Sequence, residues 1–421
     1  MYRKVTLGNG LRILTTSMPH TRSVAMGIYT AVGSRYESPP QSGISHFIEH
    51  MLFKGTARRP TAQHIAEEIE GLGGVLNAWT SDEVTVYWAK VADQHLPIAL
   101  DVLLDMFHHS KFEPEEVEKE RQVIIQEICR EMDTPEARVH NLIKALIWPD
   151  HPVGSDTAGT RTSVSAIGRR DMLDYIGHNY TPGSTVISLA GKLNHQHIVE
   201  QLDASLGAWQ PAEKPRFAPA AEAPCGPRLQ VEPKETEQAH LCVGMRGLSA
   251  SDPERFKLRI LNTVLGEGMS SRLFLEIREK RGLAYSVGSY TSHLRDTGAM
   301  VLYAGVPPNK ATATVKAMME QLDLLRSSLV PEPEIKKAKE YTKGHLLLRM
   351  EDTFSNADWG AGQEVTDRKV LSLNQVLAMV DAVTPQDVQL LAQRMFSPEK
   401  LSLAAIGPFK SERGFRSALR L

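Results

Sequence analysis

The sequence predicts an α+β protein made of two homologous halves, each an α/β sandwich with a mostly antiparallel sheet. The segments 171–191 ("DMLDYIGHNYTPGSTVISLAG") and 387–407 ("DVQLLAQRMFSPEKLSLAAIG") match at a constant offset of 216 residues. Each reads as a helix, a proline turn and a buried strand. Between the halves, residues 208–228 are rich in Pro and Ala, and proline disfavours helix interiors and central strands. We therefore expect domains at 1–207 and 229–421, joined by a linker at 208–228.

A weaker match places residues 38–55 on residues 251–268 with an offset of 213. It aligns Pro40 with Pro253 and Gly55 with Gly268. The first copy contains His46, Glu49 and His50, and the second has Arg259, Asn262 and Thr263 at those places. If the halves are duplicates, the polar chemistry belongs to the first copy alone.

Composition narrows the choice of partner and compartment. The 421 residues include 48 basic and 50 acidic ones, so bulk charge gives no reason to expect nucleic acid or an anionic membrane as a partner. Cys129, Cys225 and Cys242 form no C-x-x-C pair, which fits a reducing compartment. The N-terminus has no apolar signal region and no segment approaches the roughly 20 apolar residues of a bilayer span. We expect a soluble, cytoplasmic protein.

A polar trio marks the helix predicted within residues 43–55. Its apolar stripe consists of Ile44, Phe47, Ile48, Met51 and Leu52. His46 and His50 are four residues apart and share one face, with Glu49 on the adjacent flank. Two histidines alone favour a solvated helix face. The order H-x-x-E-H is more specific, because it is the inverzincin motif, and a metal would then require a third protein ligand.

The helix predicted over residues 113–133 offers that ligand. Glu120 and Glu127 are seven residues apart and therefore lie on one face. Glu127 is bracketed by Ile124, Ile125 and Ile128. A carboxylate among apolar side chains needs a partner that offsets its desolvation, and a metal ion would be one. The other acids of this helix are expected to be solvated or paired with Lys119 and Arg121.

These motifs resemble the pitrilysin family of inverzincin zinc metallopeptidases. H-x-x-E-H is followed by a glutamate 77 positions after the second histidine, within "ERQVIIQE". The resemblance covers the whole chain and is nearest to the mitochondrial processing peptidase β subunits and their bacterial relatives. It implies one Zn²⁺ per chain held by His46, His50 and Glu127, with Glu49 as general base and Glu120 as a supporting acid. It also implies that the two domains form a clam-shell half-chamber.

The resemblance also assigns substrate contacts in both halves. Residues 76–87 resemble the edge strand that pairs with the substrate backbone, with Asn77, Ala78 and Thr80 in it; the alternating β-formers after Gly73 and Gly74 agree. In the second half, Arg278 and Tyr285 have the spacing of an active-site pair, and Phe274 is assigned to substrate binding. Without the resemblance, Arg278 would be a solvated helix residue and Tyr285 a core residue.

The function predicted is a zinc-dependent endopeptidase that cleaves short or unfolded peptides by metal-activated attack of water. We expect a homodimer, or a heterodimer with a related subunit. The segment 266–272 ("GEGMSSR") is only a short counterpart of the glycine-rich loop in processing-peptidase α subunits, which puts presequence specificity in doubt. One alternative is a non-catalytic partner or structural subunit of a processing-peptidase-like complex. Another is a dinuclear hydrolase, which needs more carboxylates near His46 than the sequence offers.

Overall fold

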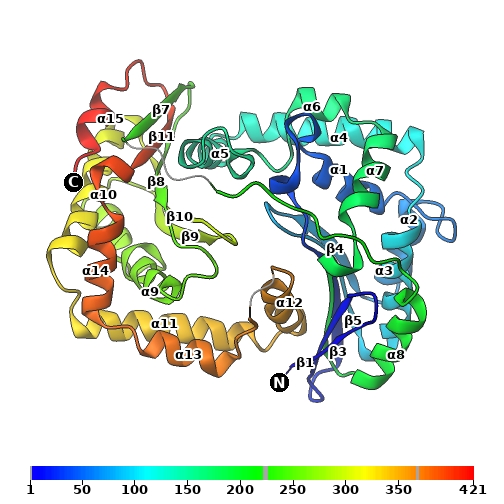
Figure 1. Cartoon of the computed structure of the whole chain (residues 1–421). Coiled ribbons are helices and arrows are strands. Elements are labelled where there is room, and N and C mark those ends of the chain that lie inside the picture. Colours follow the sequence, from blue (N-terminus) through cyan, green and yellow to red (C-terminus); the bar gives the residue numbers. More distant parts are fainter. Residues whose placement is uncertain (1, 221–225, 367–368) are drawn as a thin grey trace. The chain divides into compact units, whose positions relative to one another are not determined.

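The computed structural model describes residues 2–220, 226–366 and 369–421, and Cys225 lies outside them. The chain forms two compact units, each a sheet with helices (Figure 1). Unit 1 comprises Met1–Ile128, Asp156–Ala218 and Leu347–Ser372. Unit 2 comprises Cys129–Ser155, Pro219–Leu346 and Leu373–Leu421.

The sheet of unit 1 has six strands in the order β1-β2-β6-β3-β5-β4. The strands are β1 (Tyr2–Thr6), β2 (Arg12–Ser17), β3 (Ser23–Thr30), β4 (Val75–Thr80), β5 (Thr85–Ala92) and β6 (Thr185–Gly191). Only the β2–β6 pair is parallel. The strand β4 ends the sheet, so one of its edges is open.

The sheet of unit 2 repeats this plan in the order β7-β11-β8-β10-β9. Its strands are β7 (Arg228–Pro233), β8 (Ala239–Arg246), β9 (Ser286–His293), β10 (Gly298–Val306) and β11 (Ser402–Gly407). The β7–β11 pair is parallel and the other pairs are antiparallel, as for β2-β6-β3-β5-β4 in unit 1. Arg12 pairs with Val186 and Arg228 with Ser402, which reproduces the offset of 216. The predicted fold class is confirmed.

The units do not coincide with the domains expected from the sequence. Helix α5 (Pro135–Ile147) packs on β8 and β11 of unit 2, and α12 (Thr353–Glu364) packs on β2, β3 and β6 of unit 1. Each half of the sequence thus gives one helix to the sheet of the other half. Residues 208–218 of the expected linker belong to unit 1, where the Arg35 guanidinium donates to the Ala218 carbonyl at 2.9 Å. Periodicity shows that a helix has an apolar face, but not which sheet covers it.

The remaining helices complete the layers. Unit 1 contains α1 (Ile44–Leu52), α2 (Ala62–Glu70), α3 (Leu96–His109), α6 (Arg161–Ala166), α7 (Arg169–Asn179), α8 (His195–Leu206) and most of α4 (Pro114–Asp133). Unit 2 contains α9 (Arg255–Gly266), α10 (Ala311–Ser327), α13 (Leu373–Asp381), α14 (Pro385–Met395), α15 (Arg413–Ala418) and most of α11 (Glu332–Arg349). None of the helices in the described ranges is both long and apolar enough to cross a lipid bilayer.

Candidate metal centre

The helix α1 begins at Ile44, two residues before His46, and contacts from other segments hold its first turn in place. Gly43 has φ of +92°, and a Cβ there would meet the Ala158 carbonyl oxygen at 2.5 Å, so glycine is required. The Glu37 carboxylate accepts the backbone N–H groups of Gly43 at 2.7 Å and Ser45 at 2.9 Å. A carboxylate at this end of a helix satisfies otherwise unpaired donors. Burial raises the pKa of Glu37 to about 7, against the lowering effect of these hydrogen bonds.

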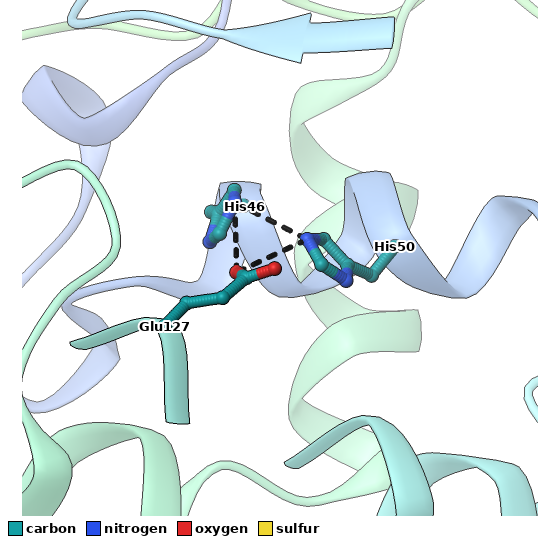
Figure 2. A group of neighbouring side chains, drawn as sticks. All are labelled: His46, His50 and Glu127. Carbon is teal, nitrogen blue, oxygen red and sulfur yellow. Dashed lines mark hydrogen bonds and ion pairs between the residues drawn. The ribbon is translucent and has the colours of Figure 1, made fainter. Parts of the chain in front are cut away.

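The two histidines of α1 and the glutamate of α4 converge (Figure 2). The Nε2 atoms of His46 and His50 are 3.3 Å apart. Oε2 of Glu127 lies 3.9 Å from Nε2 of His46 and 3.6 Å from Nε2 of His50. The structure thus brings together the three residues predicted as ligands, although 77 positions separate His50 from Glu127.

This donor set fits a zinc ion. Two imidazole nitrogens and one carboxylate are a common catalytic zinc set, and ligand atoms about 2.1 Å from a tetrahedral metal are roughly 3.4 Å apart. The three separations are close to that value. Burial lowers the pKa of His46 to about 4, with a smaller contribution from the charge of His50. A neutral imidazole is the form that binds metal.

Glu120 contacts Nδ1 of His50, the ring nitrogen that does not face the other predicted ligands. Its Oε2 lies 2.9 Å from Nδ1 of His50, and its Oε1 lies 2.5 Å from the ammonium of Lys54. Burial alone would raise the pKa of Glu120, but the hydrogen bonds from His50 and Lys54 lower it overall, so it is a carboxylate at neutral pH. Such a contact fixes the orientation of a metal-binding imidazole and raises its basicity.

The sequence argument placed the Glu127 carboxylate among apolar side chains, but in the structure Glu120 is the buried glutamate and Glu127 is the more exposed one. Glu120 is 5 % exposed, whereas the Glu127 side chain is 45 % exposed. Ile124, Ile125 and Ile128 are buried, but the Glu127 carboxylate beside them stays half-exposed. The desolvation argument for Glu127 was therefore wrong, while its position beside the histidines agrees with the family resemblance.

Glu49 directly precedes His50 on α1, and its carboxylate contacts the end of the edge strand β4. The Thr80 hydroxyl, at the end of β4, donates to Oε2 of Glu49 at 2.5 Å. Burial raises the pKa of Glu49, although the Thr80 hydrogen bond and the charge of His50 act in the opposite direction. A carboxylate with a raised pKa is a stronger base than one in water.

The strand β4 presents an open edge that leads to Glu49. Its side chains alternate between exposed and half-buried, and it pairs with β5 on one side. The Asn77 side chain accepts the N–H of Ala78 at 2.7 Å. An open edge with free backbone groups can accept an extended peptide as a further strand.

The residues predicted in the second half form one cluster within unit 2. Phe274 and Arg278 lie in a π-helix, Phe274–Lys280, which the sequence did not predict. The Arg278 guanidinium lies 4.8 Å from the Phe274 ring centre and 5.2 Å from that of Tyr285. Tyr285 is 72 % exposed, which excludes the alternative that it is a core residue. Single π-turns are rare and occur often at functional sites.

The second copy of the motif has no metal-binding chemistry. Arg259, Asn262 and Thr263 on α9 all bond the carboxylate of Glu267, at 3.1, 2.7 and 3.1 Å. Within the described ranges, His46, His50 and Glu127 are the one group of His, Cys, Asp or Glu side chains placed to share an ion. Unit 2 has replaced the ligand set with a hydrogen-bonded cluster.

A duplicated α+β fold with an inverted H-x-x-E-H motif in its first copy defines a class of zinc peptidase-like proteins. The family Insulinase (Peptidase family M16) matches residues 12–161, and Peptidase M16 inactive domain matches residues 166–341. The chain belongs to peptidase family M16, which confirms the resemblance to the pitrilysin family.

Named relatives support this family membership, and a solved structure supports the fold. A Bacillus subtilis protein named uncharacterized zinc protease YmxG is 38 % identical over 97 % of this chain and 98 % of its own length. A Streptomyces coelicolor zinc protease is also 38 % identical, over 98 % and 91 %. The crystal structure of a Helicobacter pylori protease has a TM-score of 0.91 at 23 % identity, covering 97 % of this chain and all of that one. At 23 % identity, this solved structure supports the fold alone.

The sequence analysis did not predict two contacts of the site. The Glu37 carboxylate and the Lys54 ammonium act on α1 and Glu120 through contacts that no local pattern encodes. The nearest signal for Lys54 is its place four residues after His50, just beyond the end of α1.

Proposed function

We propose that this protein is a zinc-dependent endopeptidase that cleaves short or unfolded peptides. His46, His50 and Glu127 would hold one Zn²⁺ per chain. The observation that carries the proposal is Glu49: a half-buried carboxylate with a raised pKa stands beside a complete ligand set, on the same helix. A binding protein would need the ligands but not this base.

Zinc in such a site acts as a Lewis acid toward a carbonyl oxygen and brings the pKa of water to about 7. Glu49 takes the proton of the attacking water on its carboxylate and delivers it to the leaving amine nitrogen. The Thr80 hydroxyl holds Oε2 of Glu49 in place while Oε1 receives the proton. Glu120, charged and bonded to Lys54, keeps Nε2 of His50 directed at the ligand position.

Substrate would bind as an added strand on β4. Backbone pairing tolerates many sequences and requires an extended chain, which fits short or unfolded peptides. Thr80, the last residue of β4, bonds to Glu49, so a peptide paired with this edge passes the general base. Arg278 and Tyr285 would assist from unit 2 by donating to the substrate carbonyl or backbone.

Glu49→Gln tests the proposal. Glutamine keeps the shape and the Thr80 contact but accepts no proton at working pH, so cleavage of a mixed peptide library should fall to a few per cent or less. Zinc content should stay near one equivalent. Thr61→Val, which removes a hydroxyl from the start of α2, is the matched control and should retain activity.

The same assay distinguishes the proposed endopeptidase from the alternative, a non-catalytic subunit. Such a protein would bind peptides and leave them intact in both the wild type and Glu49→Gln. Whether the chain acts as a homodimer or with a related subunit stays a prediction, for which native mass spectrometry of the zinc-loaded protein is the measurement.

A further inference from the structure

Unit 2 contains a cavity that the proposed peptidase chemistry does not use. It has a volume of about 380 Å³, within the range of roughly 300–1,000 Å³ typical of small-molecule sites. Leu146, Ile147, Met245, Leu248 and Met395 give it apolar walls. Among the described residues, the charged side chains that line it are Arg228, Arg246, Arg394 and Lys400 and one acid, Glu399. An apolar cavity with this excess of cations suits a ligand with an apolar body and a negative head.

The repeat shows that this charge is specific to unit 2. In unit 1, Arg12 donates to the backbone carbonyl of Glu364, at the end of α12, at 2.8 Å. In unit 2, the equivalent Arg228 donates to the backbone carbonyl of Leu146, near the end of α5, at 3.0 Å. The arginine at the start of β2 in unit 1, and of β7 in unit 2, therefore caps the helix that comes from the other half of the sequence.

The side chain at the end of the capped helix differs between the two units. The Glu364 carboxylate is buried, and it lies 3.5 Å from Arg12 and 2.6 Å from the ammonium of Lys4. Its counterpart in unit 2 is Leu146, which has no charge. Across the described ranges, the structure gives Arg228 no carboxylate partner. Unit 1 therefore pairs this arginine with an internal carboxylate, and the described part of unit 2 offers none to Arg228.

Two further substitutions between the repeats add positive charge at the cavity. The pairing of β11 with β8 makes Arg246 the counterpart of Ala31, and the offset of 216 makes Lys400 the counterpart of Ser184. The Arg246 guanidinium is held at 5.1 Å from the Trp148 ring centre and bonds Thr297 at 2.9 Å. Arg394 is paired with Glu254 at 2.5 Å, whereas Arg228 has no carboxylate partner in the described ranges.

We propose that the cavity binds the carboxylate of an apolar molecule, with Arg228 as the main partner of its head group. The ligand would supply the negative charge that Glu364 supplies in unit 1, and its apolar part would lie against Leu146, Met245 and Leu248. A fatty acid and the C-terminus of an apolar peptide share this chemistry. A charge-assisted hydrogen bond to a guanidinium is among the strong ones, so the head group should dominate affinity.

The experiment measures binding by calorimetry to the full chain carrying Glu49→Gln, which keeps peptides intact. The probes are decanoate, 1-decanol, and acetyl-Leu-Leu-Leu with a free or an amidated C-terminus. Decanoate or the free-acid peptide should bind, at least tenfold more tightly than its uncharged counterpart. Decanoate alone would indicate a fatty acid, and the peptide acid alone a peptide C-terminus.

Two substitutions locate the site. Arg228→Met removes the proposed partner, and Leu146→Glu installs the internal carboxylate of unit 1; each should weaken binding about tenfold or more. Arg413→Met, which removes an exposed cation of α15 outside the cavity, should change nothing. Thermal unfolding shows whether each variant is folded. Failure of all probes to bind at millimolar concentration, equal binding of acid and alcohol, or binding unaffected in both folded cavity variants would overturn the proposal.

Discussion

Replacing Glu120 by glutamine tests how far the environment of His50 sets metal affinity. The Glu120 carboxylate is buried and contacts both Nδ1 of His50 and the Lys54 ammonium. Glutamine can still accept from His50 with its oxygen, but its amide nitrogen then faces the Lys54 ammonium, and two donors meet. His50 also loses the negative charge that raises its basicity.

The size of the effect follows from these two losses. A hydrogen bond to a charged group contributes roughly 1.5–3 kcal/mol and a neutral one roughly 0.5–1.5 kcal/mol, so the exchange removes about 1–1.5 kcal/mol from the His50 contact, and the Lys54 contact is lost. Loss of such a supporting contact weakens metal binding by about 10- to 100-fold. Glu127→Gln removes a proposed ligand itself and should weaken zinc binding further. The zinc Kd is measured by competition with a fluorescent chelator.

A control variant isolates the part played by Lys54. Lys54→Met leaves Glu120 on His50 and should change zinc affinity less than Glu120→Gln does. In the double variant Glu120→Gln/Lys54→Met, the glutamine amide no longer meets the Lys54 ammonium, so part of the lost zinc affinity should return. The reasoning fails if Glu120→Gln binds zinc as the wild type does, or if it strips the metal while Glu127→Gln retains it.

Three further predictions use other parts of the structure. Tyr285→Phe should lower kcat by roughly one to three orders of magnitude, in the range of one oxyanion donor, with zinc content and Tm unchanged; a fully active variant would exclude Tyr285 from the site. Thr80→Val should shift the acidic limb of the pH–rate profile, because Glu49 loses a hydrogen bond that lowers its pKa; removing it should move that limb to higher pH, and an unmoved limb would contradict the contact. Burial raises the pKa of Glu37 from 4.5 to about 7, so the folded state holds this proton more tightly and stability is lost as pH rises from about 4.5 to 7, by about 3 kcal/mol. Glu37→Gln should flatten that part of the urea-unfolding profile, and an unchanged difference between pH 5 and 8 would refute the assignment.

The local patterns of the sequence identified the elements of the site. The apolar stripe of α1 predicted its buried face, and the i, i+4 spacing placed His46 and His50 together. The repeat at an offset of 216 anticipated two sheets of the same topology. These succeeded because helix and strand periods are properties of neighbouring residues, and each needs only a few positions to be recognised.

The tertiary structure decided what depends on distant partners. Sequence periodicity did not reveal that α5 and α12 pack on the sheet of the other half, because an apolar face is satisfied by either sheet. The buried Glu120 carboxylate contacts Lys54 and His50, which lie 66 and 70 residues away in the sequence. The Arg12–Glu364 contact and its counterpart Arg228–Leu146 likewise emerge only after folding. Burial and charge pairing are sums over everything that surrounds a side chain, and most of those neighbours are remote in the sequence.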